Sequence, residues 1–192
     1  MSERDVTSAR TASRVALDEL AGVANRIDDT AVDTAVARIA GAHRLALYGC
    51  GREALQLRGF AMRLFHMGRD VAMVGDLNAP HLAEGDLLVC SSGPGTLATV
   101  DALIGVAQDA GARVLLLTAE PSSPTARKAD DLLVIPAQTM ASDDGASATS
   151  VLPMGSLYEG ALFVLFEIMV AKLQARLGIE TSAMRARHTN LE

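Results

Sequence analysis

Short apolar runs alternate with longer amphipathic segments through most of the chain. Five runs of four residues, each rich in Leu, Val or Ala, predict strands at 45–48, 71–74, 87–90, 114–117 and 132–135. Apolar residues at helical spacing predict intervening helices at 52–67, 95–110 and 124–129. Strands that are apolar throughout are typical of a parallel sheet with both faces covered. We therefore expect an α/β fold, a three-layer doubly wound sandwich around a five-stranded parallel sheet.

The sheet is predicted to follow a helical lead-in, residues 1–41. Residues 6–27 are Ala-rich and lack proline, and Thr30 begins a capping-box pattern that predicts the start of a second helix. After the last strand, 136–150 is a loop of small residues, and 178–192 is a polar C-terminal tail. No internal linker is long enough to divide the chain, so residues 1–192 are expected to form one domain.

The last long helix, 154–177, is apolar nearly all round. Four charged residues interrupt it and leave no apolar run long enough to span a membrane: Glu159, Glu167, Lys172 and Arg176. A helix with this pattern is normally buried on two sides. Its own sheet covers one side, so we expect this helix and the first helix to pack against other subunits in a homo-oligomer, a tetramer.

Composition narrows the classes of partner. The 192 residues carry a formal net charge of -6, with 3% aromatic residues and no Trp, so nucleic acid is not expected as a partner. Two cysteines, Cys50 and Cys90, are too few for a disulfide framework or a metal site. Residues 1–18 are polar and contain no signal peptide, which favours a cytoplasmic location with free, buried thiols.

Two glycine-rich loops follow the first and third predicted strands, where doubly wound sheets bind ligands. The first loop is Gly49-Cys50-Gly51-Arg52-Glu53-Ala54. It is either a tight turn that needs glycine, or an anion site formed by helix N–H groups and Arg52, or a dinucleotide fingerprint with Asp76 as ribose ligand. An ion pair with Glu53, Asp76 or Glu84 is the alternative role of Arg52.

The second loop, Ser91-Ser92-Gly93-Pro94-Gly95-Thr96, carries three hydroxyl groups ahead of a helix. Hydroxyl and N–H groups at a helix N-terminus suit a phosphate, although Ser and Thr here are also ordinary helix caps. Because the two loops lie at neighbouring strand ends, we expect one phosphate site. Its candidate residues are Gly49, Gly51, Arg52, Ser91, Ser92, Gly93, Pro94, Gly95 and Thr96.

Several further motifs resemble one family over nearly the whole chain. The most specific are Pro153-Met154-Gly155-Ser156-Leu157-Tyr158-Glu159 and Arg187-His188-Thr189-Asn190-Leu191-Glu192, and Gly49-Cys50-Gly51-Arg52, 60–64, 84–88 and 92–95 accompany them. With these motifs the chain resembles the SIS (sugar isomerase) domain family, and within it the 6-phospho-3-hexuloisomerases. The resemblance implies a flavodoxin-like SIS fold and reversible isomerisation of a 3-hexulose 6-phosphate to fructose 6-phosphate. It also implies no metal or organic cofactor, and a tetramer with sites near subunit interfaces.

The resemblance also implies that the substrate loop is Ser92 to Leu97, which adds Leu97 to the candidate binding residues. It further implies roles for two residues. The family's general base falls on Glu159, where one carboxylate can move a proton between sugar carbons through an enediol(ate). From the residues alone, Ser156-Leu157-Tyr158-Glu159 is a capping-box pattern, and Glu159 is more readily interpreted as a helix cap. The terminal motif makes His188 a candidate to reach the site of another subunit, and a solvated tail residue is the alternative.

The chain departs from the family pattern at four positions. Glu53 and Pro94 each replace a Ser, Thr96 replaces a charged residue and Leu97 replaces a Thr. Pro94 removes a hydroxyl and an N–H donor, and Glu53 repels a phosphate unless it points away or the ligand approaches differently. A non-catalytic phosphosugar-binding SIS protein therefore stays open as an alternative to the isomerase. The Gly49-x-Gly51-x-x-Ala54 pattern keeps a second alternative open, a small NAD-binding protein.

Overall fold

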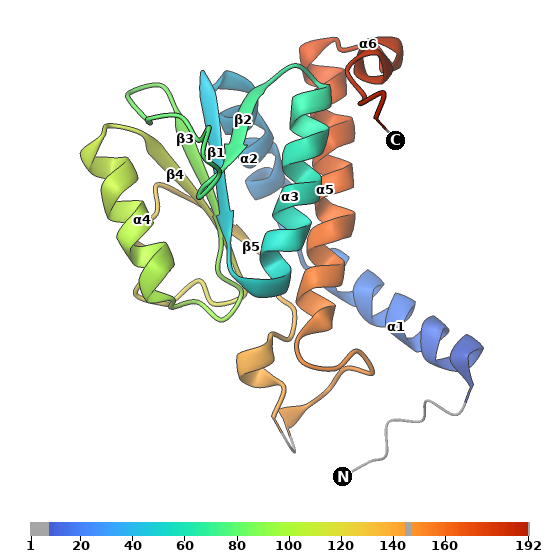
Figure 1. The fold of residues 1–192 in the computed structure, drawn as a ribbon. Coiled ribbons are helices and arrows are strands. Elements are labelled where there is room, and N and C mark those ends of the chain that lie inside the picture. Colours follow the sequence, from blue (N-terminus) through green and yellow to red (C-terminus); the bar gives the residue numbers. More distant parts are fainter. Residues whose placement is uncertain (1–7, 145–146, 192) are drawn as a thin grey trace.

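The computed structural model describes residues 8–144 and 147–191 and has the predicted three-layer arrangement (Figure 1). In these residues five parallel strands form one sheet in the order β2-β1-β3-β4-β5. They are β1 (Arg44–Gly49), β2 (Asp70–Met73), β3 (Leu87–Ser91), β4 (Arg113–Thr118) and β5 (Asp131–Val134). Every predicted strand is confirmed to within one residue at each end. Val6, Thr7, residues 145–146 of the predicted loop, and Glu192 lie outside the described residues.

Helices cover both faces of the sheet. The larger core cluster joins one face to α2 (Asp29–Gly41), α3 (Gly51–His66) and α5 (Ser156–Leu177). The smaller cluster joins the other face to α4 (Ala98–Asp109) and to the 3₁₀ turn η1 (Ala126–Lys128). Side chains of a strand alternate between faces, so Leu45 and Leu47 enter the first cluster and Ala46 the second. The apolar strands predicted from the sequence are thus buried on two sides.

Several helix ends differ from the sequence prediction. Helix α4 begins at Ala98, three residues later than predicted, because Gly95 has φ 93° and its N–H closes a turn on Ser92 O at 3.0 Å. Helix α2 is capped by Asp28, whose side chain accepts from the Thr30 N–H at 2.9 Å, so the predicted capping box at Thr30 is wrong. The segment 124–129 forms a helix over the three residues of η1 alone.

The predicted polar tail is partly helical. Residues Thr181–Ala186 form α6, which buries Met184 against the larger cluster. The Arg187 guanidinium donates to the His66 carbonyl at 3.2 Å, at the C-terminal end of α3. Met184 and Arg187 therefore help to attach this segment to the body of the protein.

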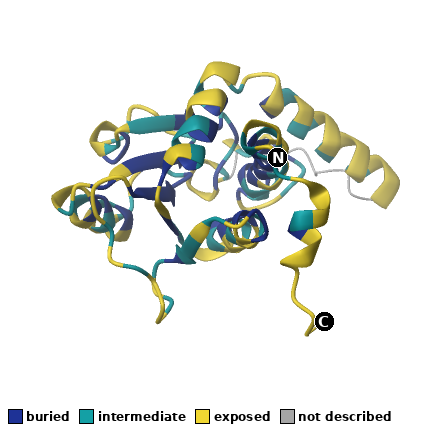
Figure 2. Cartoon of the chain, turned by 90° about the horizontal axis from the view of Figure 1, so that it is seen from above, coloured by how far each residue is buried: buried dark blue, intermediate teal, exposed yellow. Residues whose placement is uncertain are grey.

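Helix α1 (Ala9–Ala24) extends away from the body (Figure 1) and is mostly exposed (Figure 2). Its Val23 joins the core, and Glu19 accepts from the Val151 N–H at 3.0 Å, which ties α1 to the segment before α5. On α5, Phe163, Val164 and Ile168 remain 59%, 45% and 51% exposed. The second side of α5 is therefore uncovered in the single chain. Within the described residues, no helix combines the length and apolarity needed to cross a membrane.

Candidate functional site

Helices α3, α4 and α5 begin next to the carboxyl ends of the neighbouring strands β1 and β3 (Figure 1). One cleft lies at these three helix starts. The cleft has a volume of about 290 Å³, and its lining includes the cap residues of α3, α4 and α5, which are Cys50, Leu97 and Gly155. Among the described residues, no side chain of these three residues forms a capping hydrogen bond with the first turn of its helix. The first-turn N–H groups lack intrahelical acceptors, so all three helix ends favour a negative charge in the cleft.

The turn before α5 has a left-handed backbone at two consecutive residues. Met154 has φ 56° and Gly155 has φ 77°. A Cβ atom on Gly155 would lie 2.2 Å from the Met140 nitrogen and 2.6 Å from the Thr139 carbonyl carbon. Helix α5 therefore begins at Ser156 rather than at Met154, and its first turn is pressed against the 3₁₀ turn η2 (Met140–Ser142).

We expect Gly155→Ala to destabilise the fold. The left-handed conformation alone costs a non-glycine residue about 1–3 kcal/mol, and the Cβ contact with the Met140 nitrogen adds a clash with backbone. Thermal unfolding should show a lower melting temperature. Gly105→Ala in α4 is the matched control, because its Cβ meets nothing within 4 Å and should raise stability slightly. Equal melting temperatures for the two variants would contradict this explanation of the turn.

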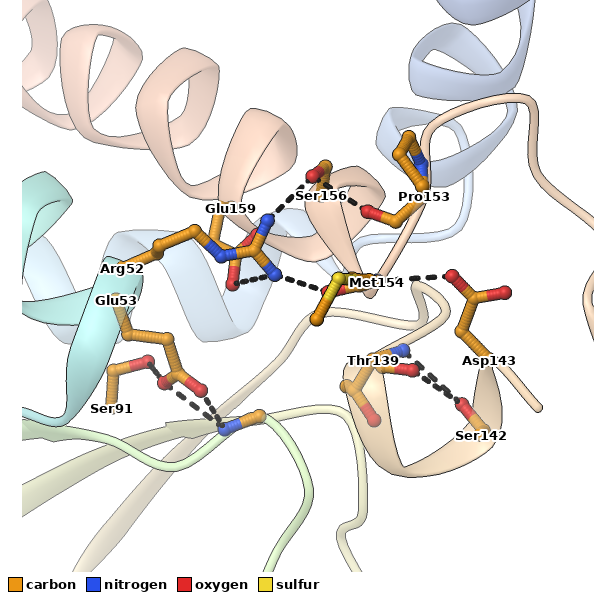
Figure 3. Close-up of polar contacts among 12 residues, drawn as sticks. Arg52, Glu53, Ser91, Thr139, Ser142, Asp143, Pro153, Met154, Ser156 and Glu159 are labelled. Carbon is orange, nitrogen blue, oxygen red and sulfur yellow. Dashed lines mark hydrogen bonds and ion pairs between the residues drawn. The ribbon is translucent and has the colours of Figure 1, made fainter.

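Arg52 connects the beginnings of α3 and α5. Its Nη1 donates to Ser156 Oγ at 2.7 Å, and its Nη2 donates to the Met154 carbonyl and lies 3.3 Å from Glu159 Oε1 (Figure 3). The predicted ion pair with Glu53, Asp76 or Glu84 is therefore wrong, and the carboxylate partner is Glu159. The left-handed turn at Met154 brings these groups together.

Glu159 lies in the first turn of α5 and lines the cleft. Its side chain is 15% exposed, and Oε2 is buried without a hydrogen-bond partner among the described residues. Burial raises the pKa of this carboxyl group, the Arg52 charge opposes the rise, and the Glu53 charge adds to it. The predicted capping box is wrong, because Gly155 is the cap residue and the Ser156 N–H bonds to Pro153 O at 3.1 Å. Oε2 is therefore free to accept a proton.

Glu53 points in a different direction from Arg52, toward the loop after β3 (Figure 3). Its carboxylate accepts from Ser91 Oγ and from the Gly93 N–H, which lies 3.1 Å from each carboxylate oxygen. Burial raises the pKa of Glu53, and these hydrogen bonds oppose the rise. Ser92 is fully buried, and its hydroxyl donates to Gly95 O at 3.2 Å. Three predicted phosphate donors are thus bonded within the protein.

The other predicted binding residues lie around the same cleft. Gly49 allows β1 and α3 to approach closely, since a Cβ there would lie 2.7 Å from Leu57 Cδ1. Gly51 has φ 56°, Pro94 and Leu97 line the cleft, and Thr96 is exposed beside it. Sequence reasoning missed Thr139, Met140 and Tyr158, which complete the lining. Tyr158 lies within the family motif at 153–159, whereas no local sequence pattern marks Thr139 or Met140.

The two cysteines are free, as predicted, but only Cys90 is fully buried. Burial raises the pKa of the Cys90 thiol to about 12. Cys50 is half-buried at the cleft, with its sulfur 3.5 Å from Tyr48 Oη and 3.5 Å from Thr99 Oγ1. In the described parts of the chain, no group of three or more His, Cys, Asp or Glu residues is arranged to hold a metal ion.

His188 lies at the opposite end of α3 from the cleft. Its ring centroid is 5.1 Å from that of His66, the last residue of α3. A helix of 16 residues is about 24 Å long, and Arg52 lies at its other end. His188 therefore does not reach the cleft of its own chain, and its role in the cleft of another subunit stays a prediction.

The fold and the cleft define a doubly wound α/β protein in which a buried carboxylate and three helix N-termini lie at one cleft. The chain belongs to the SIS domain family, whose pattern matches residues 38–164. It is 38% identical to the 3-hexulose-6-phosphate isomerase of Mycobacterium gastri, over 91% of this chain and 87% of that protein. It is 33% identical to the Bacillus subtilis protein of the same name, over 92% and 95%. The resemblance seen in the sequence is confirmed.

A solved structure supports the fold. The protein of Methanococcus jannaschii whose structure "infers a molecular function of 3-hexulose-6-phosphate isomerase" superposes with a TM-score of 0.80 at 23% identity. The match covers 93% of this chain and 98% of that one. At this level of identity the similarity establishes the SIS fold.

Proposed function

We propose that this protein is a cofactor-independent phosphosugar isomerase that interconverts a 3-hexulose 6-phosphate and fructose 6-phosphate. The observation that carries the proposal is the buried, unpartnered Oε2 of Glu159 in a cleft where three helix N-termini meet. Two relatives named for this reaction, at 38% and 33% identity over more than nine-tenths of the chain, support it. The family membership favours this function over NAD binding.

The proposed chemistry moves one proton between carbons and one between oxygens. Glu159 takes the proton from C2 of the 3-hexulose, and the C–H electrons form a C2–C3 double bond while the C3 carbonyl becomes an enediolate oxygen. Glu159 then returns the proton to C3, the O2 hydroxyl proton passes to the O3 oxygen, which becomes a hydroxyl, and O2 becomes the new carbonyl. Arg52, close to Glu159, stabilises the negative charge of the intermediate. The overall reaction needs no oxidant, so no cofactor is required.

The substrate phosphate is proposed to lie at the first turn of α4, on the side of Thr96 and Leu97. Leu97 caps this helix without a side-chain bond among the described residues, so the backbone N–H groups of the turn remain for an anion. Arg52 adds a positive charge at the adjoining end of α3. Gly49 and Gly51 shape the turn that lets α3 start at this place.

A turnover assay separates the isomerase from its strongest rival. Pro94 and the internally bonded Ser91 and Ser92 favour, as a second candidate, a phosphosugar-binding protein without activity. The isomerase predicts formation of fructose 6-phosphate from 3-hexulose 6-phosphate. The binding protein predicts a ligand-induced rise in melting temperature with no product. Product formation at only the uncatalysed rate would refute the isomerase.

We also propose a cytoplasmic homo-oligomer, a tetramer, assembled through α1 and the uncovered side of α5. Phe163, Val164 and Ile168 are exposed apolar side chains on α5, and a groove of about 230 Å³ separates α5 from α1 and α2. Light scattering should give a mass of about 80 kDa, four times the chain mass of 20.1 kDa. Ile168→Asp should lower the mass, because it places a charge in the apolar contact. A wild-type monomer at micromolar concentration would contradict the assembly.

A further inference from the structure

Glu53 occupies the loop after β3 as a bound anion would. Its carboxylate accepts from Ser91 Oγ and from the Gly93 N–H, a hydroxyl and a backbone amide that point into the same space. These are the types of donor that hold phosphate oxygens in strand-to-helix loops. The residue is 8% exposed, so the carboxylate is bound within the protein rather than in solvent.

The loop closes tightly around this carboxylate. A Cβ atom on Gly93 would lie 2.9 Å from the Tyr158 ring and 3.1 Å from Glu53 Oε1. The Tyr158 hydroxyl lies 3.3 Å from Ser91 Oγ, and the Ser92 hydroxyl is bonded to Gly95 O. The Ser91 hydroxyl and the Gly93 N–H are thus already bonded to Glu53, and a phosphate brought to the same donors would be repelled by the Glu53 charge at short range.

We propose that Glu53 is an internal anion that occupies the Ser91 and Gly93 donors and excludes the substrate phosphate from them. This inference rests on the proposed function, because it assumes a phosphorylated substrate. The phosphate is thereby restricted to the other wall of the cleft, at Arg52 and the first turn of α4. Glu53 is then a specificity-determining residue. It decides where the phosphate lies, and so which carbon of the sugar chain faces Glu159.

The test measures the affinity of inorganic phosphate and of fructose 6-phosphate by isothermal titration calorimetry. It compares the wild type with Glu53→Ser, Glu53→Gln, Ser91→Ala and the double variant Glu53→Ser/Ser91→Ala. Glu53→Ser frees both donors, so phosphate should bind about tenfold tighter or more, the usual effect of one hydrogen bond to a charged group. Adding Ser91→Ala to this variant should remove most of the gain, and Ser91→Ala alone should leave the wild-type affinity within about twofold.

Glu53→Gln is the matched control for charge, because it removes the negative charge but keeps the volume and an acceptor for the Gly93 N–H. It should gain less affinity than Glu53→Ser. An equal gain would show that Glu53 acts only through its charge at a distance and would overturn the inference. An unchanged or weaker affinity in folded Glu53→Ser would also overturn it.

Ser91→Ala in the wild-type background tests the inference even if Glu53→Ser does not fold. A loss of more than about fivefold in phosphate affinity there would place Ser91 on the ligand and contradict the occupation by Glu53. The proposed reaction is tested separately by turnover. A wild type that binds fructose 6-phosphate without isomerising it refutes the reaction, and the affinities still decide the role of Glu53.

Discussion

Replacing Glu159 by glutamine is expected to lower kcat by about 10²–10⁴-fold, the usual contribution of a positioned acid–base group. The amide keeps the shape of the side chain and can still contact Arg52, so KM and melting temperature should change little. Glutamine cannot take a proton from carbon. Steady-state kinetics with the 3-hexulose 6-phosphate, together with a thermal melt, measure both quantities.

Glu167→Gln is the control for this change on the same helix. Glu167 pairs with Arg63 at 3.2 Å, and its side chain is 42% exposed, so its loss should leave kcat within about twofold, as for most exposed ion pairs. Glu159→Gln with wild-type turnover would exclude Glu159 as the base. The structure would then leave its buried Oε2 without an explanation.

The second large effect is expected at Arg52. Arg52→Gln removes the guanidinium that bonds Ser156 Oγ and the Met154 carbonyl and pairs with Glu159. Misplacing a catalytic group in this way costs about 10²-fold in rate, and kcat/KM at neutral pH should fall by about that factor. Arg58→Gln is the control, because Arg58 lies on the same helix and makes a longer, exposed pair with Asp76 at 3.7 Å.

The pH profile of Arg52→Gln separates an electrostatic role from simple misplacement. Glu159 must be ionised to act as a base, and burial raises its pKa above the ordinary 4.5 while Arg52 lowers it. Activity should therefore be lost as the pH falls through the raised pKa. Without Arg52 the pKa rises further, so the acidic limb of kcat/KM should move to higher pH. A limb that stays in place would show that Arg52 only positions the turn.

The strands of the sheet could be predicted because the hydrophobic pattern that marks each of them lies within a few consecutive residues. Leu45–Leu47 and Leu87–Val89 are apolar at every position, which is the pattern of strands buried on two faces. The two glycine loops were also placed correctly at the ends of β1 and β3. Their positions follow from strand order, since ligand loops of such sheets meet where the order reverses.

The contacts of the site were not predictable in the same way. The Arg52–Glu159 pair depends on left-handed backbone at Met154, a non-glycine residue for which no sequence rule predicts positive φ. The same turn moves the helix start to Ser156 and removes the capping box that the sequence pattern suggested. Thr139 and Met140 reach the cleft only because Gly155 packs against them. These contacts join segments far apart in the chain, so neither periodicity nor propensity records them.

The negative charge of Glu53 conflicts with the phosphate site that the sequence predicts at the two loops. A carboxylate in a predicted phosphate loop left two outcomes, a side chain that turns away or a ligand that approaches differently. The structure turns it into the loop, onto Ser91 and Gly93. The sequence identified Glu53 as the conflicting residue, and only the structure shows where its side chain points.

Hydrogen exchange at carbon tests the central claim most directly. Fructose 6-phosphate is incubated with the protein in D₂O, and the ring and chain protons are followed by NMR. The account predicts that deuterium appears at C3, together with 3-hexulose 6-phosphate labelled at C2, because the enediolate is reprotonated from a carboxyl group that exchanges with solvent. Glu159→Gln should show neither label. The opposite result would contradict the isomerase: with saturating fructose 6-phosphate and the wild-type protein, the C3 proton is retained and no 3-hexulose 6-phosphate forms.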